Sequence, residues 1–277
     1  MTLLLTAVWS FLPANIWLTT ELIRESVMAL FIAVSFYFLI RWMDGGSWNN
    51  IGAAMLCSFP AMWLHGVSAA LWGGIGFALV FWNRGNRRWA LGRRNRILLI
   101  AVLAAAVCFI SLRLYQYIPY FPSELTLESI THYGNPLVYI PGRTDYLGEI
   151  DVKNWAEFAL WTVVRSVYFW LSPVVFDWNS WTDPAVALVD ALPLAALIVL
   201  TFLRPKQKGD GKWLAGIAAL LCYTLMFAWG TRNAGTAIRH RNLLLALLLM
   251  TCALRHTPGI ANEKTEELKN TNAERAV

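Results

Sequence analysis

The sequence carries little charge for its length. Only 14% of its 277 residues are charged, whereas 57% are hydrophobic, and a soluble domain has roughly a quarter of charged residues. Several apolar stretches reach the about 20 residues that a helix needs to cross a bilayer. A soluble protein would expose too much of this surface to remain monodisperse. The composition therefore predicts a protein with several membrane-spanning helices.

The cysteines and the basic residues argue against other classes of protein. All four cysteines lie inside apolar stretches without metal-ligand spacing (Cys57, Cys108, Cys222 and Cys252), which favours buried packing over a disulfide or a metal site. No metal and no cofactor is therefore expected. The net charge of +6 comes from arginines and lysines gathered in short loops. This pattern is typical of membrane topology and does not indicate a nucleic-acid partner.

The apolar runs predict eight crossings and hence an all-α, polytopic transmembrane helix bundle. The stretch 51–82 is too long for one crossing and contains Pro60 and Gly66, so it is expected to form two short helices. Six other stretches are each expected to cross once: 3–19, 22–42, 97–112, 184–203, 213–230 and 237–254.

Arginine and lysine predict the orientation, because short cytoplasmic loops carry an excess of both. Residues 83–96 contain six arginines, residues 204–212 form a second basic loop, and Arg41 marks a weaker third. The three loops lie on one side only if 51–82 crosses twice and 154–171 does not cross. Both termini are then cytoplasmic.

The stretch 154–171 has the composition of an interfacial helix. It combines Glu157 and Arg165 with a broad tryptophan-rich apolar face, as expected of a helix that lies in the membrane interface. The chain is therefore expected to form a single transmembrane domain over 1–256. That domain includes an extracytoplasmic loop over 115–153, and a polar cytoplasmic tail follows over 257–277.

This topology places several polar groups on the outer side. Arg24 and Glu25 open one span, the aromatic-rich loop 115–153 contains Tyr133 and Asp145, and Arg239, His240 and Arg241 open the last span. Each group also has a structural interpretation. The aromatic residues can form an interfacial belt, Arg24 and Glu25 a helix-start ion pair, and Arg239 and Arg241 can reach lipid headgroups. His240 can be a satisfied interfacial histidine.

Together these groups could form one site for glycosyl transfer from a polyprenyl carrier. Arginines can bind the phosphates of a lipid-linked donor, carboxylates can hold or deprotonate a hydroxyl, and tyrosines can stack on sugar rings. Asp190 lies within an apolar stretch, where an acid is costly and usually faces a polar cavity. Asp190 and Arg165 are therefore further candidates for substrate binding.

Three short segments resemble one protein family. Residues 12–26, which end in Leu-Ile-Arg-Glu-Ser, look like a stretch of the bacterial surface-polysaccharide (O-antigen or exopolysaccharide repeat-unit) polymerases and related multispanning GT-C-like glycosyltransferases. Residues 233–241, Asn-Ala-Gly-Thr-Ala-Ile-Arg-His-Arg, are similar to a second pattern of that group. Residues 169–173, Phe-Trp-Leu-Ser-Pro, resemble its turn before a span. Family members commonly have further spans before the Arg-Glu helix, so this chain is expected to be a truncated member.

The resemblance implies a polymerase or transferase in the bacterial inner membrane. It would move a glycan from undecaprenyl pyrophosphate to an acceptor sugar outside the cytoplasm. Arg239 and Arg241 would bind the pyrophosphate, His240 or Glu25 would act as base, and Arg24 would pair with a carboxylate or a phosphate. The expected partners are the bilayer, the polyprenyl-linked glycan and other polysaccharide-assembly proteins.

Two alternatives remain open. A metal-dependent GT-C transferase would need a divalent ion and an essential acid near the first outer loop, where Glu21 and Glu25 are available. A non-enzymatic flippase or accessory subunit would depend more on Asp190, Arg113 and Arg165.

Overall fold

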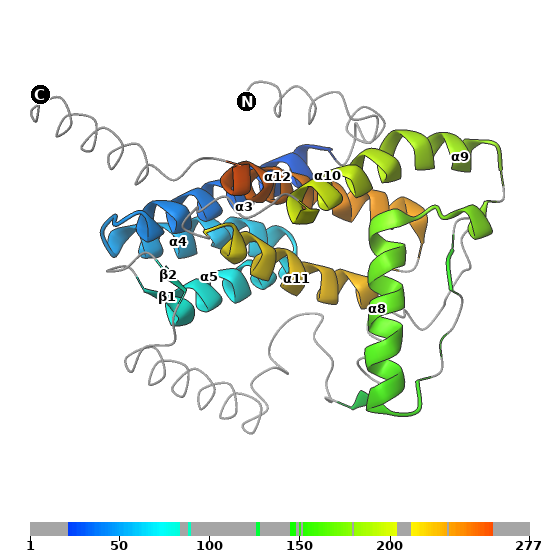
Figure 1. The fold of residues 1–277 in the computed structure, drawn as a ribbon, viewed down its shortest axis with the longest axis horizontal. Helices are drawn as coiled ribbons and strands as arrows, with labels where there is room; N and C mark the ends of the chain where they lie inside the picture. The colour runs from blue at the N-terminus through cyan, green and yellow to red at the C-terminus, as the bar shows by residue number, and fades with distance from the viewer. Residues whose placement is uncertain are drawn as a thin grey trace, which may run out of the picture.

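A computed structural model of the chain describes residues 22–83, 88–89, 126–127, 145–147, 150, 152–178, 180–203, 212–231 and 233–256. These residues are mostly helical. Their strands, β1 (Trp82–Asn83) and β2 (Arg88–Trp89), form one short antiparallel hairpin. The long helices lie alongside one another as a bundle (Figure 1). The predicted helical architecture is confirmed for this part of the chain.

Four helices in the described residues are long and apolar enough to cross a membrane. They are α3 (Leu22–Met43), the continuous run of α9 (Thr182–Val186), η4 (Ala187–Ala191) and α10 (Leu192–Leu203), α11 (Trp213–Gly230), and α12 (Ala234–His256). Each coincides with a stretch that the sequence predicts to be a span. Three predicted regions lie outside the described residues, namely the stretches 3–19 and 97–112 and the tail 257–277, and so does most of the loop 115–153.

The stretch 51–82 folds as two short helices, as predicted. They are α4 (Asn49–Leu64) and α5 (Ala70–Phe81), joined by His65 and the single turn η1 (Gly66–Ala69). Pro60 lies inside the last turns of α4, and the chain instead breaks at His65, whose backbone is extended (φ −157°, ψ 109°). The reversal brings α5 back along the bundle and leaves His65 at its end.

Small residues allow close approach of the helices. A Cβ atom added at Gly74 of α5 would lie 2.6 Å from the Cβ of Ala219 in α11, so the two helices touch where neither carries a large side chain. Ser35 of α3 donates a buried hydrogen bond of 2.6 Å to the carbonyl of Ala54 in α4. These contacts fix α5 against α11 and α3 against α4.

One end of the bundle, which we name the Lys212 end, gathers the helix termini that the sequence predicts to be cytoplasmic. Lys212 forms an ion pair with Asp44, which follows α3, and the indole of Trp82 donates to the carbonyl of Met43 at 3.2 Å. Arg255 of α12 donates to the carbonyl of Phe202 at 3.0 Å. The turn after α3, the hairpin, the end of α10 and the start of α11 therefore share one side, as the distribution of basic residues predicts.

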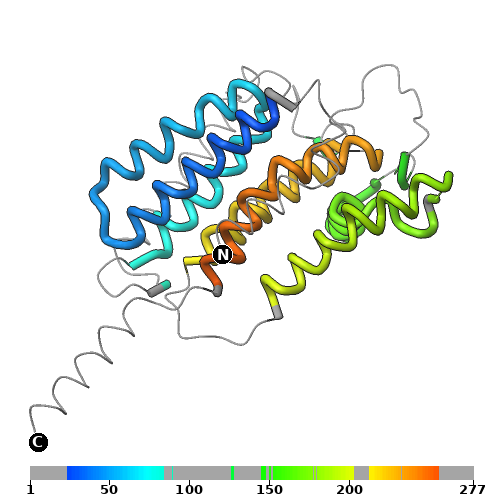
Figure 2. The backbone as a smooth tube through the Cα atoms, turned by 90° about the horizontal axis from the view of Figure 1, so that it is seen from above, coloured from blue at the N-terminus to red at the C-terminus, as the bar shows by residue number. Residues whose placement is uncertain are grey.

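Helix α8 (Trp155–Leu171) lies crosswise to the bundle at the opposite end. Figure 1 shows it crossing the end of α11, and Figure 2 views it end-on. Its first turn is capped by Asn154, whose side-chain oxygen accepts from the Glu157 amide at 2.9 Å. The polar face is not the outer one, however: Arg165 is buried, whereas Leu160 and Val163 are exposed. An apolar outer face on a crosswise helix is consistent with contact with lipid.

Candidate functional site

The candidate site lies at the end of the bundle opposite the Lys212 end, and we name it the His240 end. It is built from the start of α3, the His65 turn, the end of α11 and the first turns of α12. These segments are remote in sequence and meet because α3 and α12 pack against each other, as do α11 and α12.

Two imidazoles and a phenyl ring are in mutual contact at this end. His240 stacks on Phe227 with ring centroids 4.3 Å apart, and His65 meets His240 edge-on at 5.4 Å. His65 is also 5.8 Å from Phe227. Burial lowers the pKa of His65 below its usual 6.5, and the positive charges of Arg24 and Arg239 lower it further. His65 is therefore held in its neutral form at neutral pH.

Thr231 orients the second imidazole. Its hydroxyl is hydrogen-bonded to Nδ1 of His240 at 2.9 Å, which leaves Nε2 of His240 without a hydrogen-bond partner among the described residues. A partner on one ring nitrogen fixes the orientation of the ring and selects what the other nitrogen can do. Thr231 thus presents His240 Nε2 as the atom that could exchange a proton.

The backbone of Thr231 is itself fixed by two side chains. Its carbonyl accepts from the Tyr146 hydroxyl at 3.1 Å and from Arg165 Nη2 at 3.3 Å. Arg165 also donates to the carbonyl of Ala228 at 2.7 Å and lies over the Trp229 ring, 4.8 Å from its centroid. Burial raises the pKa of the Tyr146 phenol, so this phenol remains a donor at neutral pH.

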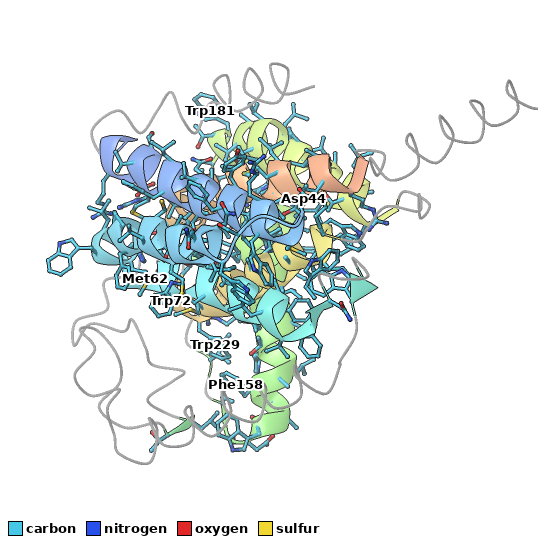
Figure 3. The ribbon with its side chains drawn as sticks, turned by 90° about the vertical axis from the view of Figure 1, so that its left-hand side faces the viewer. Asp44, Met62, Trp72, Phe158, Trp181 and Trp229 are labelled. Atoms are coloured by element: carbon cyan, nitrogen blue, oxygen red, sulfur yellow. The ribbon has the colours of Figure 1, made fainter. Side chains whose placement is uncertain are left out.

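Aromatic packing joins the end of α11 to α8 next to these hydrogen bonds. Trp229 stacks against Phe158 of α8, with ring centroids 4.9 Å apart and planes inclined by 9° (Figure 3), and its indole donates to the Thr162 hydroxyl at 2.9 Å. The crosswise helix therefore holds the end of α11 in place. Arg165, which the sequence predicts to bind substrate, links α8 to the residue that orients His240.

A carboxylate shared by two arginines lies at the same end. Glu25 Oε1 forms ion pairs with Arg239 of α12 and with Arg24 Nη2, the latter at 3.8 Å. The Glu25 side chain is 9% exposed, whereas those of Arg24 and Arg239 are 45% and 24% exposed. Both arginines therefore retain exposed side-chain surface beside a nearly covered carboxylate.

Arg241 points into the protein instead. It is 1% exposed and donates to Asp190 Oδ2 at 2.6 Å, and it also donates to the carbonyls of Trp170 and Ser172 at 2.7 and 2.9 Å. Asp190 lies in η4, a π-helical turn within the second candidate span. This pair ties α12 to η4 and to the end of α8.

Helix geometry explains why the two arginines of the last span separate. Residues two apart in an α-helix do not share a face. Arg239 therefore reaches the surface and Glu25, and Arg241 turns to the interior and Asp190. The structure brings Arg24, Glu25, Arg239 and His240 together, and it places Arg241, Asp190 and Arg165 behind them as supports.

The loop candidates are only partly described. Asp145 forms an isolated antiparallel bridge with Asn233 next to the His240 end, while Tyr133 lies outside the described residues. Sequence reasoning missed His65, Thr231, Tyr146 and Phe227. Two of them carried a signal: His65 marks the break in the long apolar run 51–82, and Thr231 directly follows the span that ends at Gly230.

No cluster of three or more potential metal ligands occurs among the described residues. The chain matches no protein-family model, no curated protein and no solved structure.

Proposed function

We propose that this chain is an eight-span protein of the bacterial inner membrane that transfers a glycan from an undecaprenyl-(pyro)phosphate carrier to an acceptor sugar on the extracytoplasmic side. The observation that carries the proposal is the juxtaposition of the Arg24–Glu25–Arg239 cluster with the His65–His240 pair. This end of the bundle lies opposite the Lys212 end, which carries the predicted cytoplasmic turns. Helix α8 would lie in the outer interface.

Each group has a role that fits its position. Arg24 and Arg239 reach the surface and can bind and stabilise the negative charge of a phosphate leaving group. The Nε2 atom of His240, presented by Thr231, can accept the proton of the attacking sugar hydroxyl. Arg241 and Asp190 are assigned to positioning, because their buried pair fixes the helix that carries both Arg239 and His240.

A non-enzymatic role is the second candidate, and the buried Arg241–Asp190 pair favours it. Charged groups inside a span frequently mark a substrate pathway, so the same chain could be a flippase for lipid-linked sugars or an accessory subunit of a polymerase. A flippase would move its lipid across proteoliposomes without forming a glycosidic bond. An accessory subunit would act only in the presence of its polymerase.

Profiling of surface polysaccharide on a gel tests the enzymatic proposal. A deletion strain is complemented with wild type, with the double variant Arg24→Ala plus Arg239→Ala, or with Lys212→Ala as a matched loss of a cation at the other end. We expect deletion to collapse the polymer ladder to single repeat units. Wild type and Lys212→Ala should restore the ladder, and the double variant should not. An intact ladder after deletion, or full restoration by the double variant, would exclude the enzymatic proposal.

A further inference from the structure

The Arg24–Glu25–Arg239 cluster has the form of an anion site that already contains an anion. A carboxylate and a phosphate present similar oxygens to a guanidinium, and arginine binds both through the same N–H groups. In the described structure one oxygen of Glu25 lies within ion-pair distance of two arginines, one from α3 and the other from α12. The three residues thus show where an anion is held between the two helices.

The exposed fractions of the three side chains indicate which of them an external anion would meet first. Glu25 is almost covered, and both arginines retain exposed side-chain surface. An anion that approaches from outside therefore meets the arginine side chains before Glu25 and would compete with Glu25 for their N–H donors. By contrast, the pair between Arg241 and Asp190 is buried on both sides, and an external anion cannot reach it without opening the bundle.

We infer that Glu25 is a built-in competitor for the phosphate site, so that binding of a phosphate on a lipid carrier exchanges the Glu25–Arg239 ion pair for a phosphate–Arg239 pair. This inference rests on the proposed function, because it takes the lipid-linked phosphate as the ligand. The exchange involves no covalent step. Under this exchange, loss of the Glu25 charge should raise the affinity for the ligand, whereas loss of the Arg239 charge should lower it.

Binding of farnesyl pyrophosphate to the detergent-purified full chain tests the inference, with farnesol as a control for the lipid tail and inorganic pyrophosphate as a control for the headgroup. Glu25→Gln keeps the shape of the side chain and removes its charge, and we expect about three- to tenfold tighter binding. Arg239→Gln is expected to weaken binding by about tenfold. Asp44→Asn, in the ion pair at the other end, should leave the affinity unchanged.

Each outcome separates the competitor role from the site itself. Unchanged or weaker binding by Glu25→Gln, together with weaker binding by Arg239→Gln, would overturn the competitor role and leave the phosphate site standing. No binding of farnesyl pyrophosphate above farnesol in wild type and in every variant would remove the phosphate site and the proposed function with it. If inorganic pyrophosphate binds as well as farnesyl pyrophosphate, the site recognises a soluble anion, which overturns the lipid-carrier part of the inference.

A second variant keeps the test valid if Glu25→Gln does not elute as a monodisperse protein. Glu25→Asp retains the charge but withdraws it by one methylene, and it should tighten binding by a smaller factor than Glu25→Gln. Binding by Glu25→Asp that is equal to or weaker than wild type would again count against the competitor role.

Discussion

The two ends of the bundle use charge differently. At the Lys212 end, Lys212 and Asp44 form an ion pair with side chains 14% and 38% exposed, and Arg255 lies over the ring of Trp213. At the His240 end, the side chains of Arg241 and Asp190 are only 1% and 10% exposed. Arg165 is also buried there and donates hydrogen bonds to backbone carbonyls. Exposed ion pairs contribute little to stability, whereas breaking a buried pair leaves an uncompensated charge. Loss of one partner is therefore expected to cost more stability at the His240 end than at the Lys212 end.

The largest expected effect is a difference in stability loss between variants at the two ends. Arg241→Met leaves Asp190 buried without its guanidinium, so we expect a loss of about 3–5 kcal/mol of stability. Lys212→Gln should cost about 1 kcal/mol or less. Thermal unfolding followed by fluorescence-detected gel filtration measures both. The double variant Arg241→Met plus Asp190→Leu should recover part of the loss, and equal midpoints for the two single variants would show that the ends do not differ in this way.

An intermediate effect is expected from the residue that orients His240. Thr231→Val removes the hydroxyl but keeps the shape of the side chain, so the imidazole loses its partner on Nδ1. The rate of polymer formation in isolated membranes should fall on the order of 10- to 100-fold, and its pH profile should shift. Thr231→Ser retains the hydroxyl and should stay near wild type. Wild-type rate and pH profile in the valine variant would argue against a positioning role for Thr231.

The smallest expected effect is a pH dependence of stability. Because the pKa of His65 is lowered in the folded protein, the unfolded chain binds more protons between that lowered pKa and about 6.5. Stability should therefore rise with pH through this window and fall on acidification. In His65→Gln the unfolding midpoint should change less between pH 7.5 and pH 5. An equal change in variant and wild type would mean that His65 does not contribute to the dependence.

Much of the architecture could be predicted because it depends on local composition. The long apolar runs that became α3, α11 and α12, and the reversal within 51–82, follow from segment length and from where apolar residues stop. The capped amphipathic α8 also follows, since Asn154 and Glu157 form a local pair. These features need no knowledge of which helices become neighbours.

The pairing of charges could not be predicted in the same way. Whether Arg241 meets lipid, ligand or Asp190 depends on the contact between α12 and η4, which no local pattern encodes. The burial of Arg165 has the same origin, because its acceptors are carbonyls at the end of another helix. Helical spacing alone, however, places Arg239 and Arg241 on different faces of α12.

The ion pair between Glu25 and Arg239 joins residues 214 positions apart. Chains are synthesised at about 5–20 residues per second and begin to fold from the N-terminus. The start of α3 therefore waits roughly 10 to 40 s for this partner after it leaves the ribosome. Until α12 has been synthesised, Glu25 is present without Arg239. The Arg24–Glu25–Arg239 cluster is thus completed only after α12 has been synthesised.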